Sequence, residues 1–264
     1  MEGQAEKLEA TAPKLYSSFA KYYDRLESQY RDYEEDSRWI DFFLRSHDAK
    51  NVVDVSCGTG NHVSRLTNVD LFTVALDSSR AMIAEASKKN NNRKVELGRA
   101  DFLNLPLRKN SFDCALCMYW SLAGLSDNLV LRLFKEVNFI LSNSGILIFD
   151  VENVDGIKEN LIDAPFIDSF FQDGDVSVIR ANYSRKTSPD VVDWHAYYLF
   201  EEGGVSRLVE DRTNLRFYSR GRLEELLSKS GFETLEVRSG PFKPFEKNSP
   251  SLYFVAQKKE DAVF

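Results

Sequence analysis

Short apolar runs alternate with segments of helical periodicity between residues 51 and 149, and this alternation constrains the fold more than any other feature. Runs this short and this apolar are typical of parallel strands that are buried on both faces. Two more apolar runs near the end of the sequence bring the expected number of strands to seven. The pattern therefore predicts an α/β fold with a doubly wound sheet. Strands are expected at 51–55, 71–76, 95–98, 112–118, 146–149, 232–237 and 252–256, and helices at 63–66, 79–89, 127–141 and 222–228.

Two segments lie outside this alternation. Helical spacing from about Ser17 to Arg45 predicts an N-terminal helical cap. After the fifth strand, strand-like stretches follow one another without a helix between them, so we expect an antiparallel β insertion. These stretches lie at 176–185, 191–201 and 205–217.

The expected domains follow from these segments. The insertion would act as a lid, a substrate-binding face or a dimer interface. Within the core, the helix that starts at Asp127 is expected to end in a C-cap formed by Asn143, Ser144 and Gly145. The chain divides into a tail and helical cap (1–45), a ligand-binding core (46–155 and 219–264) and the insertion (156–218).

Charge and cysteine content narrow the class of protein. The 264 residues carry 41 acidic and 34 basic side chains, a formal net charge of −7, whereas proteins that hold long nucleic acids usually carry a basic excess. Three cysteines do not indicate a disulfide framework and fit a reducing compartment. The N-terminus lacks the apolar segment of a signal peptide, and no apolar run reaches the roughly 18 residues that span a bilayer. We expect a cytoplasmic protein that acts on small molecules, with no nucleic-acid or membrane partner.

The sequence DVSCGTG, from Asp54 to Gly60, follows the first predicted strand, which is where the ligand of a doubly wound sheet binds. Gly58 and Gly60 fit the start of a dinucleotide fingerprint, but Val63 stands where that fingerprint has its third glycine. The carboxylate of Asp54 would repel a pyrophosphate and attract an ammonium group. A nicotinamide-dependent oxidoreductase is therefore disfavoured, and a cofactor with a cationic end is favoured.

Together with three later motifs, this turn resembles that of the class I S-adenosylmethionine-dependent methyltransferases, whose sheet is Rossmann-like and seven-stranded. The segments LDSSRAMI, GRADF and FDCALCM match the second, third and fourth motifs of that family, in order and in strand context. The resemblance implies that Asp54 orders the amino group of the cofactor, Asp77 binds the ribose hydroxyls and Asp101 binds the adenine amino group. It implies S-adenosylmethionine as cofactor and S-adenosylhomocysteine as product. The implied cofactor-binding residues are Tyr23, Tyr33, Asp54, Ser56, Cys57, Gly58, Gly60, Asp77, Ser78, Met82, Ala100, Asp101, Phe102 and Met118.

The flanking segments FAKYYDRL and CMYWSLAGL resemble small-molecule N-methyltransferases of amino sugars and of glycine. In the amino-sugar enzymes a histidine often follows the fourth strand, and Gly124 departs from that pattern. The resemblance implies that a tyrosine at position 22 or 23 closes over the cofactor and that residues 31–33 contact its carboxylate. The candidates for the acceptor pocket are Tyr23, Tyr119, Trp120 and His195.

Three other residues invite a chemical interpretation. Cys114 and Cys117 form a C-x-x-C pair, but residues three apart on a strand point to opposite faces. No second pair of cysteines or histidines follows, so we expect two core cysteines and no metal site. A single histidine such as His195, between Trp194 and Ala196, is more often structural than catalytic.

The sequence as a whole predicts methyl transfer to a small acceptor, at nitrogen in preference to oxygen. The protein would hold the reactants at reacting distance and exclude water, and Tyr23, Tyr119 and His195 stay open as the base that takes a proton from an amine. One alternative is a methyltransferase of RNA or protein, which the acidic charge and the lack of an Asn/Asp-Pro-Pro-Tyr/Phe sequence after the fourth strand disfavour. The other is a non-catalytic binding protein, because a fold does not fix a function. An antiparallel insertion can also present a sheet edge to a second copy, so a homodimer is expected as one option.

Overall fold

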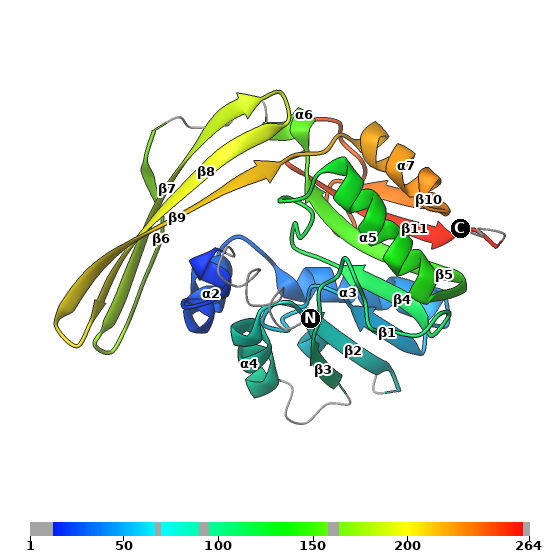
Figure 1. Cartoon of the computed structure of the whole chain (residues 1–264), viewed down its shortest axis with the longest axis horizontal. Coiled ribbons are helices and arrows are strands. Elements are labelled where there is room, and N and C mark those ends of the chain that lie inside the picture. The colour runs from blue at the N-terminus through cyan, green and yellow to red at the C-terminus, as the bar shows by residue number, and fades with distance from the viewer. Residues whose placement is uncertain (1–12, 67–69, 90–94, 158–163, 261–264) are drawn as a thin grey trace.

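The computed structural model describes residues 13–66, 70–89, 95–157 and 164–260, and places their strands in two sheets. A seven-stranded mixed sheet forms an α/β core, and a four-stranded antiparallel sheet projects from it (Figure 1). The predicted α/β class, the doubly wound core and the antiparallel insertion are all confirmed.

The central sheet consists of β1 (Asn51–Asp54), β2 (Phe72–Asp77), β3 (Val95–Arg99), β4 (Phe112–Cys117), β5 (Leu141–Glu152), β10 (Phe232–Arg238) and β11 (Ser251–Lys258). Its order is β10-β11-β5-β4-β1-β2-β3. The pairs among β1 to β5 are parallel, whereas β11 runs antiparallel to both β5 and β10. Because the order of the strands reverses at β1, the crevice at the carboxyl ends of β1 and β4 is where a ligand is expected.

Helices cover both faces of this sheet. They are α3 (Tyr33–Ser46), α4 (Arg80–Lys89), α5 (Asp127–Ile140), the short α6 (Val154–Ile157), α7 (Arg220–Lys229) and the 3-10 turn η3 (Val63–Arg65). Apolar residues of α5 and α7 pack on one face with Cys117, and Trp39 and Ile40 of α3 pack on the other face with Cys114. Both cysteines are core residues on opposite faces, as predicted. None of these helices in the described ranges is long and apolar enough to cross a membrane.

The end of helix α5 differs from the prediction. The expected C-cap over residues 143–145 is wrong, because α5 ends at Ile140 and β5 begins at Leu141. Leu141 is fully buried, has an extended backbone and pairs with Phe112 of β4. Burial of this apolar side chain at the start of an internal strand favours a direct passage from helix to strand.

The N-terminal cap is a series of short helices rather than one helical segment. It contains η1 (Lys14–Tyr16), η2 (Ala20–Tyr22) and α2 (Tyr23–Glu27), and α3 starts only at Tyr33. Asp32 explains where α3 begins, since its side chain accepts a hydrogen bond from the backbone N–H of Glu35 at 2.9 Å. Asp is a favoured N-cap residue because it satisfies a backbone N–H that has no partner in the helix.

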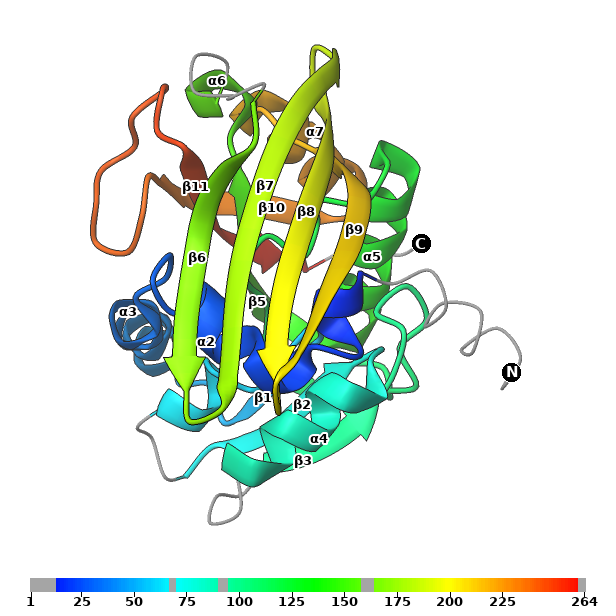
Figure 2. The same cartoon turned by 90° about the vertical axis from the view of Figure 1, so that its left-hand side faces the viewer.

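The insertion has four antiparallel strands, not the three that were predicted. They are β6 (Phe166–Asp173), β7 (Val176–Ser188), β8 (Val191–Glu202) and β9 (Val205–Arg216). Figure 2 shows this sheet face on, with the cap helices behind its lower half. The sequence did not predict β6, because Ser169 is its only buried residue and its apolar residues do not alternate with polar ones.

The insertion leaves the core and returns to it at adjacent points. Asn153, just after β5, forms a β-bridge with Tyr218, just after β9. The backbone N–H of Tyr218 donates to the carbonyl of Glu152, and the backbone N–H of Val154 donates to the carbonyl of Tyr218, both at 3.2 Å. The four strands therefore form a loop of chain whose two ends are held together by backbone hydrogen bonds.

One apolar cluster joins the cap, the four-stranded sheet and the core. Leu26 of α2, Met82 of α4 and Tyr198 of β8 belong to this cluster and are completely or almost completely buried. In Figure 1, α2 lies between the four-stranded sheet and the core. The cap thus fills the space between the two sheets, next to the carboxyl ends of β1 and β2.

Candidate functional site

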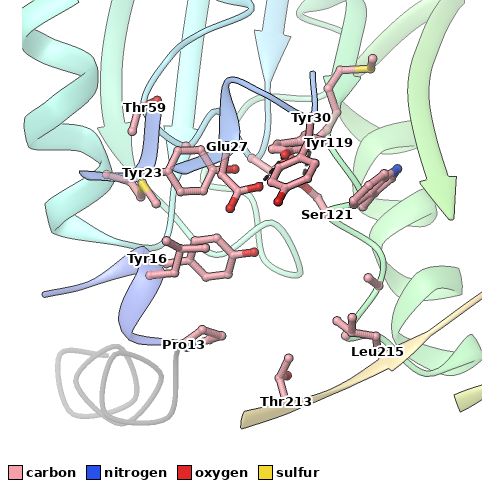
Figure 3. Close-up of a pocket in the computed structure, with 18 of the residues that line it drawn as sticks. Pro13, Tyr16, Tyr23, Glu27, Tyr30, Thr59, Tyr119, Ser121, Thr213 and Leu215 are labelled. Carbon is pink, nitrogen blue, oxygen red and sulfur yellow. Dashed lines mark hydrogen bonds between the residues drawn. The ribbon is translucent and has the colours of Figure 1, made fainter. Parts of the chain in front are cut away.

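A cavity of about 630 Å³ lies at this junction of cap, core and insertion. Its walls come from the turn after β1, the ends of β2, β4 and β5, the cap helices and the inner face of β7, β8 and β9. Figure 3 shows Tyr16 and Tyr23 of the cap on one side, and Thr213 and Leu215 of β9 on the other. Its volume falls within the range of small-molecule sites, which is about 300–1,000 Å³.

The glycine turn after β1 forms one end of the cavity. Gly58 and Gly60 have positive φ values of 53° and 76°, a backbone conformation that favours glycine. The backbone N–H of Gly58 donates to Asp77 Oδ2 at 2.9 Å, which ties the turn to the end of β2. A Cβ atom added at Gly58 would meet no protein atom within 4 Å. The turn therefore presents bare backbone to open space, where a ligand can approach closely.

Asp77 is the acidic residue beside this turn. It lines the cavity, and its other oxygen, Oδ1, accepts a hydrogen bond from the backbone N–H of Ser79 at 2.8 Å. Burial raises the pKa of its carboxyl above the ordinary value, although backbone N–H groups partly offset this effect. A hydroxyl or cationic ligand would stabilise the ionised form of this carboxyl.

Asp54 lies behind the turn rather than on the cavity wall. Its side chain is almost completely buried and accepts a hydrogen bond from the backbone N–H of Ser56 at 3.1 Å. Burial, with a smaller contribution from the charge of Asp77, raises the pKa of Asp54 to about 7. Asp54 therefore supports the turn, and its predicted contact with an amino group stays a prediction.

The cap closes onto the turn through α2. Asp24 accepts hydrogen bonds from Thr59 Oγ1 at 2.6 Å and Asn61 Nδ2 at 2.8 Å. On the same helix, Tyr23 and Glu27 are four residues apart and both line the cavity. The helix is therefore fixed to the turn by one side chain and faces the cavity with two others.

Arg31 offers a buried donor near the cap. Its Nη1 donates to Asp150 Oδ2 at 2.7 Å, and its Nε donates to Asp36. Its Nη2 is buried and has no hydrogen-bond partner among the described residues. The two N–H bonds of this Nη2 thus have no protein partner in the described ranges, although Arg31 is not among the residues that line the cavity. The carboxylate contact implied for residues 31–33 stays a prediction.

Tyr119 and Trp120 follow β4 with positive φ values of 62° and 57°, which are uncommon for residues other than glycine. The backbone N–H of Tyr119 donates to Asp150 Oδ1 at 2.6 Å, and its hydroxyl donates to Glu27 Oε2 at 2.6 Å. The indole Nε1 of Trp120 is buried without a partner in the part of the chain that the structure describes. Strained backbone held in place by hydrogen bonds is common at ligand sites.

The sequence analysis did not predict the charged residues that line the cavity from α2, β5 and the insertion. Arg180 of β7 pairs through Nη1 with Glu27 Oε1 at 2.5 Å and through Nη2 with Asp168 Oδ2 at 2.8 Å. Glu152, at the end of β5, also lines the cavity. The spacing of Tyr23 and Glu27 could have indicated Glu27, and Arg180 two residues from Asn182 could have indicated a polar inner face of β7.

The predicted site residues divide into two groups. His195 lies outside the cavity, paired with Asp193 at 3.1 Å and stacked on Tyr183 with ring centroids 4.6 Å apart. Asp101 accepts a hydrogen bond from the backbone N–H of Leu103 at 2.9 Å and does not line the cavity, which leaves its adenine contact a prediction. Asp54, Gly60 and Ala100 also do not line it. The predicted residues that do are Tyr23, Tyr33, Ser56, Cys57, Gly58, Asp77, Ser78, Met82, Phe102, Met118, Tyr119 and Trp120.

These residues fit the S-adenosylmethionine that the sequence motifs imply. Gly58 leaves open space beside the turn, and Asp77 faces the same space with acceptor oxygens. The free Nη2 of Arg31 would suit a carboxylate. The described residues of the cavity wall include four carboxylic acids and one guanidinium, a balance that favours a ligand with ammonium and sulfonium charges.

Comparisons with known proteins point in the same direction. A family model described as a methyltransferase domain matches residues 52–145. The glycine/sarcosine N-methyltransferase of Parasynechococcus marenigrum (strain WH8102) is 30% identical over 231 residues, which cover 83% of this chain and 76% of that protein.

Two solved structures share the fold. A S-adenosylmethionine-dependent methyltransferase from Clostridium acetobutylicum ATCC 824 is 23% identical, with a TM-score of 0.76 over 92% of this chain and 98% of that one. The sugar N-methyltransferase KedS8 from Streptoalloteichus sp. ATCC 53650 is 23% identical, with a TM-score of 0.71 over 87% of this chain and 89% of that one. Both alignments include the core and extend well beyond the residues that match the family model.

Proposed function

Since this chain belongs to the class I S-adenosylmethionine-dependent methyltransferases, we propose that it transfers the methyl group to a nitrogen atom of a small-molecule acceptor. When bound, the cofactor supplies a methyl group that the positive charge on its sulfur makes electrophilic. What the chain must add is a site that holds an amine beside that methyl group, keeps water out and lets the amine lose a proton.

The observation that carries this proposal is the acidic wall of the cavity. Within the described part of the chain, four carboxylic acids and one guanidinium line a single space, which extends from the glycine turn to the inner face of the four-stranded sheet. An amine is cationic at neutral pH, so such a wall attracts it and strengthens its binding. The N-methyltransferase names of the relative from Parasynechococcus marenigrum and of KedS8 support nitrogen as the target atom.

The cap and the insertion support the choice of a small acceptor. Tyr23 of α2 and Trp194 of β8 both line the cavity, and the apolar cluster around Leu26 closes the gap between these two elements. We propose that Gly58, Asp77 and Arg31 hold the cofactor, and that the cap and insertion cover the acceptor. In the same way, the core (46–155 and 219–264) would bind the cofactor and the insertion (156–218) would select the acceptor. A homodimer through a sheet edge of the insertion stays one option within this proposal.

A two-stage experiment tests the function. Purified protein is first titrated calorimetrically with S-adenosylmethionine, S-adenosylhomocysteine and NADH, and we expect micromolar binding of the two sulfur compounds only. The rate of S-adenosylhomocysteine release is then measured with a panel of small amines, small alcohols and transfer RNA. Release with alcohols or transfer RNA but not with amines would contradict the proposal, and so would failure of folded protein to bind either sulfur compound.

A further inference from the structure

The carboxylic acids of the cavity differ in whether they already have partners. Glu27 pairs with Arg180 and accepts the hydrogen bond of Tyr119. Asp168 pairs with the same Arg180, and Asn182 Nδ2 donates to its Oδ2 at 2.6 Å. Asp77 accepts two backbone N–H groups. Three of the four carboxyl groups are therefore occupied.

Glu152 is the fourth. Its side chain has no hydrogen bond and no ion pair among the described residues, although it lies at the carboxyl end of a central strand and lines the cavity. Two residues earlier on the same face of β5, Asp150 is saturated by Arg31 and the backbone N–H of Tyr119. Burial and the charge of Asp150 raise the pKa of Glu152 to about 8. Glu152 is half-buried, and a carboxyl group that lines a cavity without a protein partner is expected where a ligand supplies that partner.

The cationic groups of the cavity wall show the opposite pattern. Among the lining residues that the structure describes, Arg180 is the one Lys or Arg, and both ends of its guanidinium are held by Glu27 and Asp168. His62, which also lines the cavity, has its Nε2 3.1 Å from Asp36 Oδ2. Among the described lining residues, the wall therefore offers a free carboxyl group but no free cation for a carboxylate of the acceptor. The unpartnered Nη2 of Arg31 lies outside this lining and is assigned above to the cofactor.

We propose that the methyl acceptor is a cationic amine without a carboxylate, and that Glu152 binds its amino nitrogen. This inference rests on the proposed function and narrows its substrate class. The positive charge of a bound ammonium group lowers the raised pKa of Glu152 and favours its ionised form. An ammonium N–H then donates to a carboxylate oxygen of Glu152. When the proton moves, the N–H bond breaks, an O–H bond forms on Glu152, and the electron pair stays on nitrogen, which becomes nucleophilic. An amino acid would instead bring its carboxylate against an acidic wall.

Matched pairs of acceptors test the substrate class on the wild-type protein. Each pair is an amino acid and the amine that lacks its carboxylate: L-phenylalanine and phenethylamine, L-serine and 2-aminoethanol, L-ornithine and putrescine. Binding is measured by calorimetry on protein saturated with S-adenosylhomocysteine, and rates are measured with S-adenosylmethionine. We expect at least one amine to exceed its amino acid tenfold or more in kcat/KM and in affinity. Amino acids that equal or exceed their amines, or binding by no member of any pair, would overturn the inference.

Substitution of Glu152 tests its role separately. Glu152→Gln keeps the shape of the side chain and removes its charge, and we expect KM for the best amine to rise at least tenfold. The Kd for S-adenosylhomocysteine should stay within twofold. Glu233→Gln, on the exposed surface of β10, is the control and should change neither value. An unchanged KM in Glu152→Gln would show that Glu152 does not bind the amine.

The two proposals fail in different ways. If S-adenosylhomocysteine does not bind, or if no amine and no amino acid is methylated, the proposed function is contradicted. If the cofactor product binds and amino acids are the better acceptors, only the narrower inference fails. Glu152→Asp gives an additional check, because a shorter carboxylate should restore part of the amine affinity that Glu152→Gln loses.

Discussion

The Tyr119 hydroxyl donates a hydrogen bond to Glu27 Oε2 across 2.6 Å, and this contact joins the end of β4 to the last residue of α2. The other oxygen of Glu27 pairs with Arg180 of β7. One carboxylate therefore connects the core, the cap and the four-stranded sheet. Figure 3 shows Glu27 directed toward Tyr119 at the wall of the cavity.

Tyr119→Phe tests the first of these connections. The variant removes a hydrogen bond to a buried charged group, so the free energy of unfolding should fall by about 1.5–3 kcal/mol. Tyr197→Phe is the control, because the Tyr197 hydroxyl lies 3.5 Å from Glu210 on the exposed outer face of the sheet. Urea denaturation of both variants measures the difference. Equal stability losses would show that the Tyr119 hydroxyl does not fasten the cap.

Arg180→Met tests the second connection. The variant leaves Glu27 and Asp168 as buried carboxylates without their cation, and loss of one partner of a buried ion pair costs about 3–5 kcal/mol. Arg207→Met removes a pair with Glu202 on the exposed surface and should cost about 0–1 kcal/mol. Chemical denaturation compares the two. A small loss in Arg180→Met would mean that the acids of the cavity do not depend on this arginine.

Gly58→Ala and Gly174→Ala form a matched pair. Both glycines have positive φ values, 53° and 59°, and a Cβ at either position would meet no protein atom within 4 Å. The strain of an L-residue in this conformation should lower stability by about 1–2 kcal/mol in both variants. Only Gly58 borders the cavity, so only Gly58→Ala should raise the Kd for S-adenosylhomocysteine, by tenfold or more in calorimetry. A similar Kd in the two variants would place the cofactor elsewhere.

Asp77→Ala addresses the ribose contact that the sequence motifs imply. The variant removes a charge-assisted acceptor, and we expect the Kd for S-adenosylhomocysteine to rise at least tenfold, which corresponds to about 1.4 kcal/mol. Asp175→Ala, in the exposed turn between β6 and β7, is the control and should bind normally. Calorimetric titration measures both. An unchanged Kd in Asp77→Ala would contradict the assignment of Asp77 to the ribose.

We expect Asp54→Asn to change how the free energy of unfolding depends on pH. Burial raises the pKa of Asp54 to about 7 in the folded chain, whereas an unfolded Asp has a value near 3.9. Folding therefore disfavours ionisation, and the wild type should lose stability relative to Asp54→Asn as the pH rises from about 4 to about 7. Above that range the difference should stay constant, at a few kcal/mol, since a pKa difference of one corresponds to about 1.4 kcal/mol.

Asp113→Asn should show the opposite sign and serves as the control. Burial raises the pKa of Asp113, but N–H groups of Lys50 and Asn51 outweigh this effect and hold it below the ordinary value. Its carboxylate stabilises the fold at neutral pH and stops doing so as the pH falls below about 4. Thermal unfolding of both variants and the wild type between about pH 2 and pH 9 measures the two trends. Parallel curves for Asp54→Asn and the wild type would contradict the prediction for Asp54.

The sequence predicted the central sheet well, because each strand is a local apolar run. Burial can be predicted from the apolar run alone for Val52 and Val53 of β1 and for Ala115 and Leu116 of β4. The glycine turn at Gly58 was likewise predicted from residues adjacent in the sequence. In contrast, β6 has only Ser169 buried, so its place in the sheet depends on pairing with β7 and not on its own pattern.

The acidic wall could not be predicted in the same way. Glu27 and Arg180 are 153 residues apart, and nothing near either of them indicates that they pair. Neighbouring residues of a strand such as Trp194 and His195 face opposite sides, but the sequence does not indicate which side faces the cavity. That choice depends on the cap, whose apolar cluster fixes the inner face of the sheet. Trp194 lines the cavity and His195 lies outside it.

The bridge between Asn153 and Tyr218 has a consequence for how such a protein can diversify. Because the four-stranded sheet begins and ends at neighbouring points of the core, its strands can lengthen, shorten or exchange side chains while the central sheet keeps its register. The glycine turn and Asp77 belong to the core. Changes in the insertion therefore leave this half of the site unaltered. Evolution, or an engineer, could therefore replace the part of the proposed acceptor site that the insertion contributes, and keep Glu152 and the proposed methyl-donor site of the core for new chemistry.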